Sequence, residues 1–123
     1  MSMTVKIAMQ GMTDLEVLLA ALREMRITAH LVENNNGLKS KQRFIRAIIK
    51  GHRVDFVKNK NRAISMVGDG DWRIMRDKIF YRKLKQQYSL EAVKKKVIEL
   101  SYHIASTETL EDGSIKLVAR AWR

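Results

Sequence analysis

The 123-residue sequence contains no cysteine and no proline. Without cysteine, the chain cannot form a disulfide framework, a thiolate zinc site or a cysteine nucleophile. No apolar run approaches the roughly 18 to 20 residues needed to span a bilayer. The N-terminal stretch also lacks the hydrophobic region and cleavage site of a secretory signal. These absences predict a chain that does not enter a membrane and that works inside the cell, in the cytoplasm.

The sequence also has no linker-like stretch, no low-complexity segment and no repeat of solenoid period. Its length is typical of one domain, and 46% hydrophobic residues are enough for a folded core. We therefore expect one domain covering residues 1–123.

Positive charge is abundant, and it is unevenly placed. The net charge is +11. Residues 38–62 carry a net +8 and residues 72–99 a net +6, whereas the two ends of the chain are close to neutral. One basic run is usually just a solvated surface, but two of them in one small domain favour an anionic partner.

Apolar alternation and helical spacing predict the secondary structure. The first helix is expected after a capping box in which Thr13 and Glu16 satisfy the first free amides. The second helical region is expected to begin at Asp77, with a break near Ser89. The predicted strands are residues 4–9, 29–32, 43–49, 53–58, 63–67, 103–108 and 114–121. This order predicts an α+β fold with a mostly antiparallel sheet and helices packed on one face.

Residues that could perform catalysis are sparse. The three histidines, His30, His52 and His103, lie far apart in the sequence, and none belongs to a spaced metal-binding motif. The sequence contains no phosphate-binding loop of the Gly-x-x-x-x-Gly-Lys type. We therefore expect no enzyme activity, no bound metal and no cofactor.

The two basic segments are better suited to nucleic acid, because lysine and arginine neutralise phosphates and release counterions. Within the stretch KGHRVDFVKNKNR, alternation predicts that Val54 and Phe56 face the core while Arg53, Asp55 and Val57 face outward. Phe44 is also expected in the core. The candidate nucleic-acid-binding residues are Lys39, Lys41, Arg43, Arg46, Lys50, Arg53, Lys58, Lys60, Arg62, Arg73, Arg76, Lys78, Tyr81, Arg82 and Lys85.

No recognition helix, zinc finger or RNA-binding aromatic motif is present. The expected ligand is therefore single-stranded RNA such as messenger RNA, bound with little sequence preference, and DNA is also possible. An alternative is an adaptor that docks an acidic protein partner through the same basic surface. A membrane-surface role is disfavoured, because the helix carrying residues 94–96 needs its apolar stripe for the core. The oligomeric state is not predicted.

Four stretches carry a resemblance to a known family. They are TVKIAM followed by TDLEVLLAALREM, then GDGDW before a helix, and finally LEDGSIKLVARAW at residues 110–122. In order and spacing the chain resembles a conserved uncharacterised family encoded in plastid and cyanobacterial genomes. The family has no transferable catalytic motif, so the resemblance implies a single-domain fold and not an activity.

The basic middle departs from those relatives. In this respect the chain resembles the RNA-binding chimallin C proteins of nucleus-forming jumbo phages. That resemblance implies RNA binding without catalysis, in the cytoplasm of a bacterial host.

Overall fold

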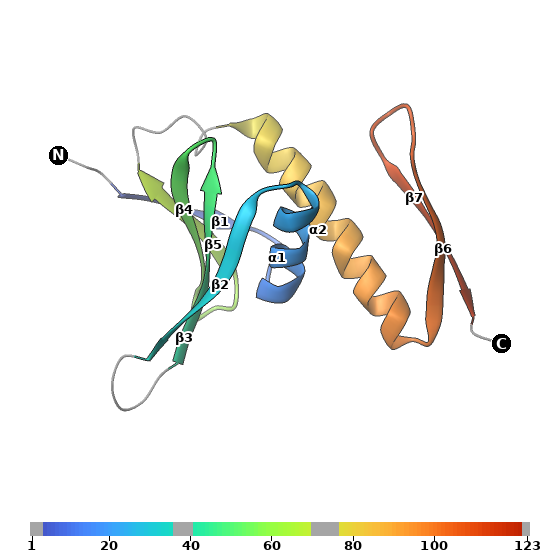
Figure 1. Ribbon diagram of the computed structural model, residues 1–123, viewed down its shortest axis with the longest axis horizontal. Helices are drawn as coiled ribbons and strands as arrows, with labels where there is room; N and C mark the ends of the chain where they lie inside the picture. Colours follow the sequence, from blue (N-terminus) through green and yellow to red (C-terminus); the bar gives the residue numbers. More distant parts are fainter. Residues whose placement is uncertain (1–3, 36–40, 70–76, 122–123) are drawn as a thin grey trace.

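A five-stranded antiparallel sheet and two helices account for most of the fold (Figure 1). The computed structural model describes residues 4–35, 41–69 and 77–121. The elements are β1 (Thr4–Met9), α1 (Leu15–Glu24), β2 (Thr28–Asn35), β3 (Lys41–Ile49), β4 (His52–Lys58), β5 (Ile64–Asp69), α2 (Lys78–Glu99), β6 (Tyr102–Thr109) and β7 (Ile115–Ala121).

The strands of the large sheet lie in the order β1-β5-β4-β3-β2. Strands β2 to β5 therefore form a meander, and β1 pairs with β5 to form one edge of the sheet. Both helices lie against one face of this sheet (Figure 1). The α+β prediction, with an antiparallel sheet and helices on one face, is confirmed, and each predicted strand is present.

The core follows from strand alternation. One row of apolar side chains crosses the whole sheet on its helix side, contributed by Leu31, Ile45, Phe56, Met66 and Ile7 in the order of the strands from β2 to β1. Phe56 and Ile45 in this row are completely buried. The prediction that Val54 and Phe56 face the core is therefore confirmed.

A tight turn fixes the register between β3 and β4. Ile49 pairs with His52, which leaves only Lys50 and Gly51 in the loop. Both loop residues have positive φ, 51° and 82° respectively. This is the combination that a type I′ hairpin turn requires, and its twist matches that of the strands it joins.

Helix α1 begins one residue later than the capping-box pattern predicts. Asp14, and not Thr13, is the N-cap, and its Oδ1 accepts from the backbone N–H of Glu16 at 2.9 Å and of Val17 at 3.3 Å. The prediction of a Thr13 cap is wrong. An aspartate carboxylate caps as well as a threonine hydroxyl, and it adds a negative charge at the positive end of the helix dipole.

Helix α2 runs without interruption for 22 residues from the predicted Asp77 cap. The predicted break near Ser89 is wrong, because the Ser89 hydroxyl donates to the Lys85 carbonyl at 2.9 Å and is accommodated within the helix. The buried side of α2 is formed by Leu84, which is completely buried, and by Tyr88 one turn later. The hydroxyl of Tyr88 accepts the backbone N–H groups of Thr13 and Asp14, which joins α2 to the start of α1.

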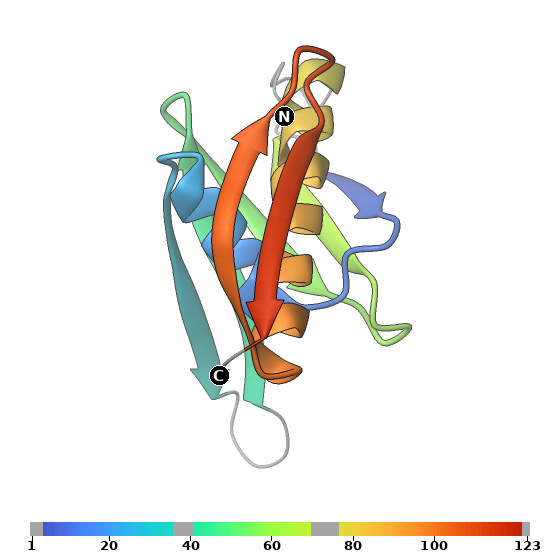
Figure 2. The same ribbon diagram turned by 90° about the vertical axis from the view of Figure 1, so that its right-hand side faces the viewer.

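The β6–β7 hairpin lies on the far side of the helices from the large sheet, so the helices are between two β layers (Figure 1). Figure 2 views the molecule from the hairpin side, with both helices behind it. The Gln86 side chain donates to the Gly113 carbonyl and ties the hairpin turn to α2. No helix in the part of the chain that the structure describes is long and apolar enough to cross a membrane.

Candidate functional site

The face of the large sheet turned away from the helices is not covered by either helix (Figure 1). Alternation and register bring basic, aromatic and aliphatic side chains from all five strands onto this face. We call this surface the open face, and it comprises Lys6, His30, Val32, Phe44, Arg46, Ile48, Arg53, Asp55, Val57 and Val67.

An acidic residue lies at the centre of the open face and orients two arginines. Asp55 belongs to the middle strand, and its side chain is only 18% exposed. Its Oδ1 accepts from Arg46 Nε at 3.3 Å, and its Oδ2 lies 3.5 Å from Arg53 Nη2. The carboxylate neutralises one positive charge and holds both guanidinium groups in place, so the cluster keeps a net charge of +1.

An aromatic ring lies next to this cluster. The guanidinium carbon of Arg46 is 5.2 Å from the centroid of the Phe44 ring, within the range of a cation–π contact. The prediction that Phe44 lies in the core is wrong. Phe44 pairs with Val57 in the register of β3 and β4, and Val57 faces outward as predicted, so Phe44 shares the open face and stays partly exposed.

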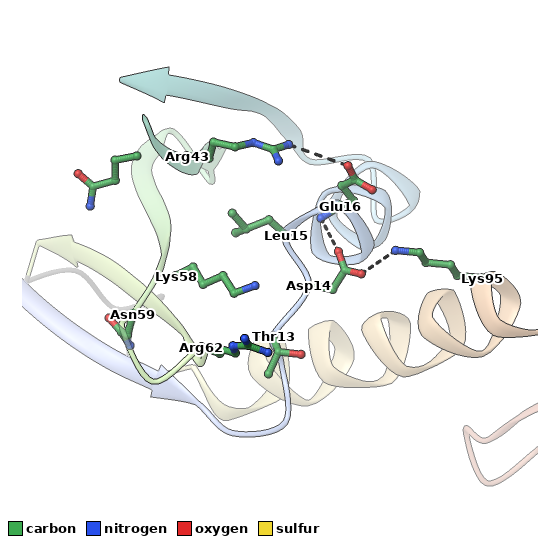
Figure 3. Close-up of a pocket in the computed structure, with 10 residues that line it drawn as sticks. Thr13, Asp14, Leu15, Glu16, Arg43, Lys58, Asn59, Arg62 and Lys95 are labelled. Atoms are coloured by element: carbon green, nitrogen blue, oxygen red, sulfur yellow. Dashed lines mark hydrogen bonds and ion pairs between the residues drawn. The ribbon is translucent and has the colours of Figure 1, made fainter. Parts of the chain in front are cut away.

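A polar pocket lies at the end of the sheet where α1 begins, on the helix side (Figure 3). Its volume is about 670 Å³. We call it the α1 pocket. Residues from β3, the end of β4, the β4–β5 turn, both helices and the β1–α1 loop line it. They are Thr13, Asp14, Leu15, Glu16, Gln42, Arg43, Lys58, Asn59, Arg62 and Lys95.

The charges in the α1 pocket are only partly compensated. Lys95 Nζ lies 2.8 Å from Asp14 Oδ2, and Arg43 lies 3.9 Å from Glu16 and 3.6 Å from Glu33. Lys58 and Arg62 form no ion pair with any residue that the structure describes.

The Asp14–Lys95 pair changes both pKa values. Partial burial pushes the pKa of Asp14 upward, but the hydrogen bond from Lys95, the Lys95 charge and the capped amides outweigh it, so the pKa lies below its ordinary value. The same hydrogen bond and the Asp14 charge raise the pKa of Lys95. Both groups are therefore fully charged at neutral pH.

A third region follows the edge strand β1, where the first half of α2 crosses it. A groove of about 780 Å³ lies there, and it brings together the predicted residues Lys78, Tyr81, Arg82 and Lys85. Tyr81 is partly buried and packs against the core with its ring, while the three basic side chains are exposed. Ile7 and Met66 contribute the apolar floor of the groove.

The predicted basic residues therefore occupy three regions and do not form one continuous strip. Lys50 lies beside the third region, 3.8 Å from Asp77 at the end of the groove, and Lys60 is exposed in the β4–β5 turn. Lys39, Arg73 and Arg76 fall outside the described residues, as does the side chain of Lys41.

Sequence reasoning missed three basic or titratable residues in these regions. Lys6 and His30 lie on the open face in one row with Arg46, Asp55 and Val67. Strand alternation could have placed both of them there.

Lys95 in the α1 pocket could not have been found in this way, because its contact with Asp14 spans 81 residues of sequence. Over residues 4–35, 41–69 and 77–121, the structure has no group of three or more histidine, aspartate or glutamate side chains that could hold a metal ion.

Comparison with known proteins gives one match. The model of a family described as "Protein of unknown function (DUF1257)" matches residues 21–118. This span includes the end of α1, β2 to β5, α2, β6 and the first half of β7. No curated protein and no solved structure matches the chain.

Proposed function

We propose that this chain, which belongs to the DUF1257 family of proteins of unknown function, is a non-enzymatic protein that binds single-stranded RNA with little sequence preference. The membership confirms the expected link to a conserved uncharacterised family. The activity is inferred from the chemistry of the open face and of the basic residues around it.

One observation carries the proposal: the open face has a partly exposed ring, Phe44, in contact with the guanidinium of Arg46. RNA bases that are not paired stack on aromatic rings and on guanidinium planes. Neither helix blocks this face (Figure 1), and Asp55 forms ion pairs with both Arg46 and Arg53. A base can stack at Phe44 and Arg46 while Arg53 binds the adjoining phosphate.

Basic residues outside this cluster provide the remaining phosphate contacts. Lys58, Lys60 and Arg62 follow one another at the end of β4 and in the turn after it, and none forms an ion pair within the described residues. Their charges are therefore available for an external anion. Contacts of this kind do not depend on the base, which is why we propose sequence-tolerant binding.

The same face also has features of a protein-binding surface, and these favour the second candidate function. Ile48 is 46% exposed, and the partly exposed side chains of Val32, Val57 and Val67 lie on the same face. Aliphatic surface contributes to protein interfaces but little to phosphate binding. An adaptor that docks an acidic protein partner would use these side chains together with Arg46 and Arg53.

The resemblance of the basic middle to the chimallin C proteins of jumbo phages supports RNA over the acidic partner. The proposal therefore includes a phage-encoded member of the family that acts in the cytoplasm of its bacterial host. A plastid or cyanobacterial relative would share the fold and lack the strongly basic middle.

The test compares ligands with the purified protein. Fluorescence anisotropy at several salt concentrations would measure binding to single-stranded RNA, duplex DNA and anionic lipid vesicles. We expect the tightest binding to single-stranded RNA, with log Kd rising by about 0.7 per phosphate contact for each tenfold increase in salt. If RNA is not bound at low salt, the proposal is wrong.

Charge reversal locates the surface. Arg53→Glu combined with Lys58→Glu should remove two phosphate contacts and lower the salt slope by about 1.4. Lys116→Glu combined with Arg120→Glu is the matched control, because it makes the same change in net charge on exposed hairpin residues. His52→Ala should change little. Equal losses in both double variants would show attraction by net charge alone and would contradict a binding surface that includes Arg53 and Lys58.

A further inference from the structure

In the α1 pocket, unlike on the open face, an excess of positive charge lines a hollow in the surface. Four of its lining residues are basic and two are acidic. Lys95 is paired with Asp14, and Arg43 lies near Glu16 at a longer distance. The excess positive charge of the pocket therefore belongs to Lys58 and Arg62.

These two side chains come from different segments and line the same pocket. Lys58 ends β4, and Arg62 lies in the turn that follows, where its backbone has a positive φ of 72°. The backbone N–H of Arg62 donates to the Asn59 carbonyl at 2.9 Å, which closes the turn. Figure 3 shows the ammonium of Lys58 directed toward the segment that carries Asp14 and Leu15. The closed turn thus holds both cations beside the same hollow.

The surplus positive charge of the pocket matches the charge of a phosphomonoester better than that of a phosphodiester. A phosphodiester within a strand carries one negative charge, whereas a phosphomonoester carries about −1.5 to −2 at pH 7. The arginine fork binds two phosphate oxygens at once, and the lysine adds a point charge. Two uncompensated cations beside one pocket therefore complement a phosphomonoester.

The pocket also has room for more than the phosphate. Its volume of about 670 Å³ falls within the usual range of roughly 300–1,000 Å³ for small-molecule sites. The exposed Thr13 and the side chains of Gln42 and Asn59 line the same hollow and offer hydrogen bonds to a sugar or base.

We propose that the α1 pocket binds a terminal phosphomonoester of the RNA strand, with Lys58 and Arg62 as its main ligands. This inference rests on the proposed RNA binding and adds a preference for a phosphorylated strand end. A free mononucleotide carries the same phosphomonoester, so the experiment must separate the two sources.

The experiment compares three versions of one oligoribonucleotide that carry a 5′-phosphate, a 3′-phosphate or hydroxyl groups at both ends. Anisotropy titrations should show binding at least about fivefold tighter for one phosphorylated version than for the hydroxyl version. Lys58→Gln combined with Arg62→Gln should abolish this ratio, and Arg62→Gln alone should reduce it. Thermal unfolding of each variant checks that the fold is retained.

The matched control is Lys116→Gln combined with Arg120→Gln, which removes the same charge from the hairpin and should leave the ratio unchanged. Equal affinity for all three oligonucleotides would overturn the inference and leave the proposed RNA binding intact. Absence of binding to any of them would overturn both. Binding of adenosine monophosphate that depends on Lys58 and Arg62, without a preference among the oligonucleotides, would assign the pocket to a free mononucleotide and overturn the strand-end assignment.

Discussion

The large sheet with its helices and the β6–β7 hairpin differ in how much apolar surface they bury. Every buried hydrophobic residue of the described chain lies between Met9 and Tyr88, and none belongs to the hairpin. The strands of the hairpin pair on both sides of a register shift between Ile104 and Ser106, yet most of β6 is exposed. A two-stranded hairpin is marginally stable by itself in water. Backbone pairing alone therefore does not make a stable unit, and the hairpin depends on its contact with α2.

The first prediction uses the same substitution in the two regions. Leu84→Ala should lower the free energy of unfolding by about 2–5 kcal/mol, because Leu84 is completely buried and the change leaves a cavity. Leu117→Ala in β7 should cost under about 1 kcal/mol, since its side chain is only partly buried. Urea denaturation followed by circular dichroism measures both. Equal costs would show that the hairpin shares the core of the large sheet.

A second pair of substitutions removes one hydroxyl from each region. Tyr88→Phe leaves the amides of Thr13 and Asp14 without their acceptor and should cost roughly 1–3 kcal/mol. Tyr102→Phe in β6 should be close to neutral, because Tyr102 is 42% exposed. Thermal unfolding of the two variants compares them. An unchanged midpoint for Tyr88→Phe would mean that water replaces the hydroxyl at the start of α1.

The smallest expected effect is the dependence of stability on acidic pH. Asp14 at the start of α1 and Asp112 in the hairpin turn both have a lowered pKa, the latter through hydrogen bonds from Ser114. Each charged carboxylate therefore stabilises the folded state at pH values above its unfolded-state pKa near 3.8, and the contribution is lost as the pH falls through the lower folded-state pKa. At pH 7, Asp14→Ala should cost about 0.5–2 kcal/mol through loss of the helix cap.

Denaturation at a series of pH values separates the two carboxylates. The cost of Asp14→Ala should shrink below pH 3.8. Asp112→Ala should have a smaller cost that fades over the same pH range, because Asp112 is exposed and its hydrogen bonds from Ser114 lie within one turn. A pH-independent cost for Asp14→Ala would show that the cap stabilises without its charge.

The secondary structure could be predicted from the sequence because most strands alternate clearly. In β4 the alternation is unambiguous, and Val54 and Phe56 are buried as predicted while Arg53, Asp55 and Val57 face outward. β3 is different, since Phe44 and Ile48 give its outer face an apolar character as well. A strand that is apolar on both faces does not reveal which face is inward, and only its pairing with β4 decides this.

The candidate site was less predictable than the fold. Charge counts locate the basic segments along the chain, but they do not show that Asp55 holds Arg46 and Arg53 together. Nor do they show that Lys95 neutralises Asp14 and so leaves the surplus charge of the pocket to other residues. Pairings of this kind depend on tertiary contacts, which local sequence patterns do not encode.

The pairing of β1 with β5 has a consequence for the order of assembly. Strands β2 to β5 each pair with a neighbour in sequence, whereas Thr4 at the start of β1 pairs with Asp69 at the end of β5. During synthesis from the N-terminus, β1 emerges first and has no partner until β5 has been made. Closing so long a loop is slow compared with forming the hairpins of the meander. We therefore expect β1, the first of the five sheet strands to be translated, to join the sheet last. Until then both edges of its backbone are open to pairing with another chain, whereas in the folded sheet only its outer edge is.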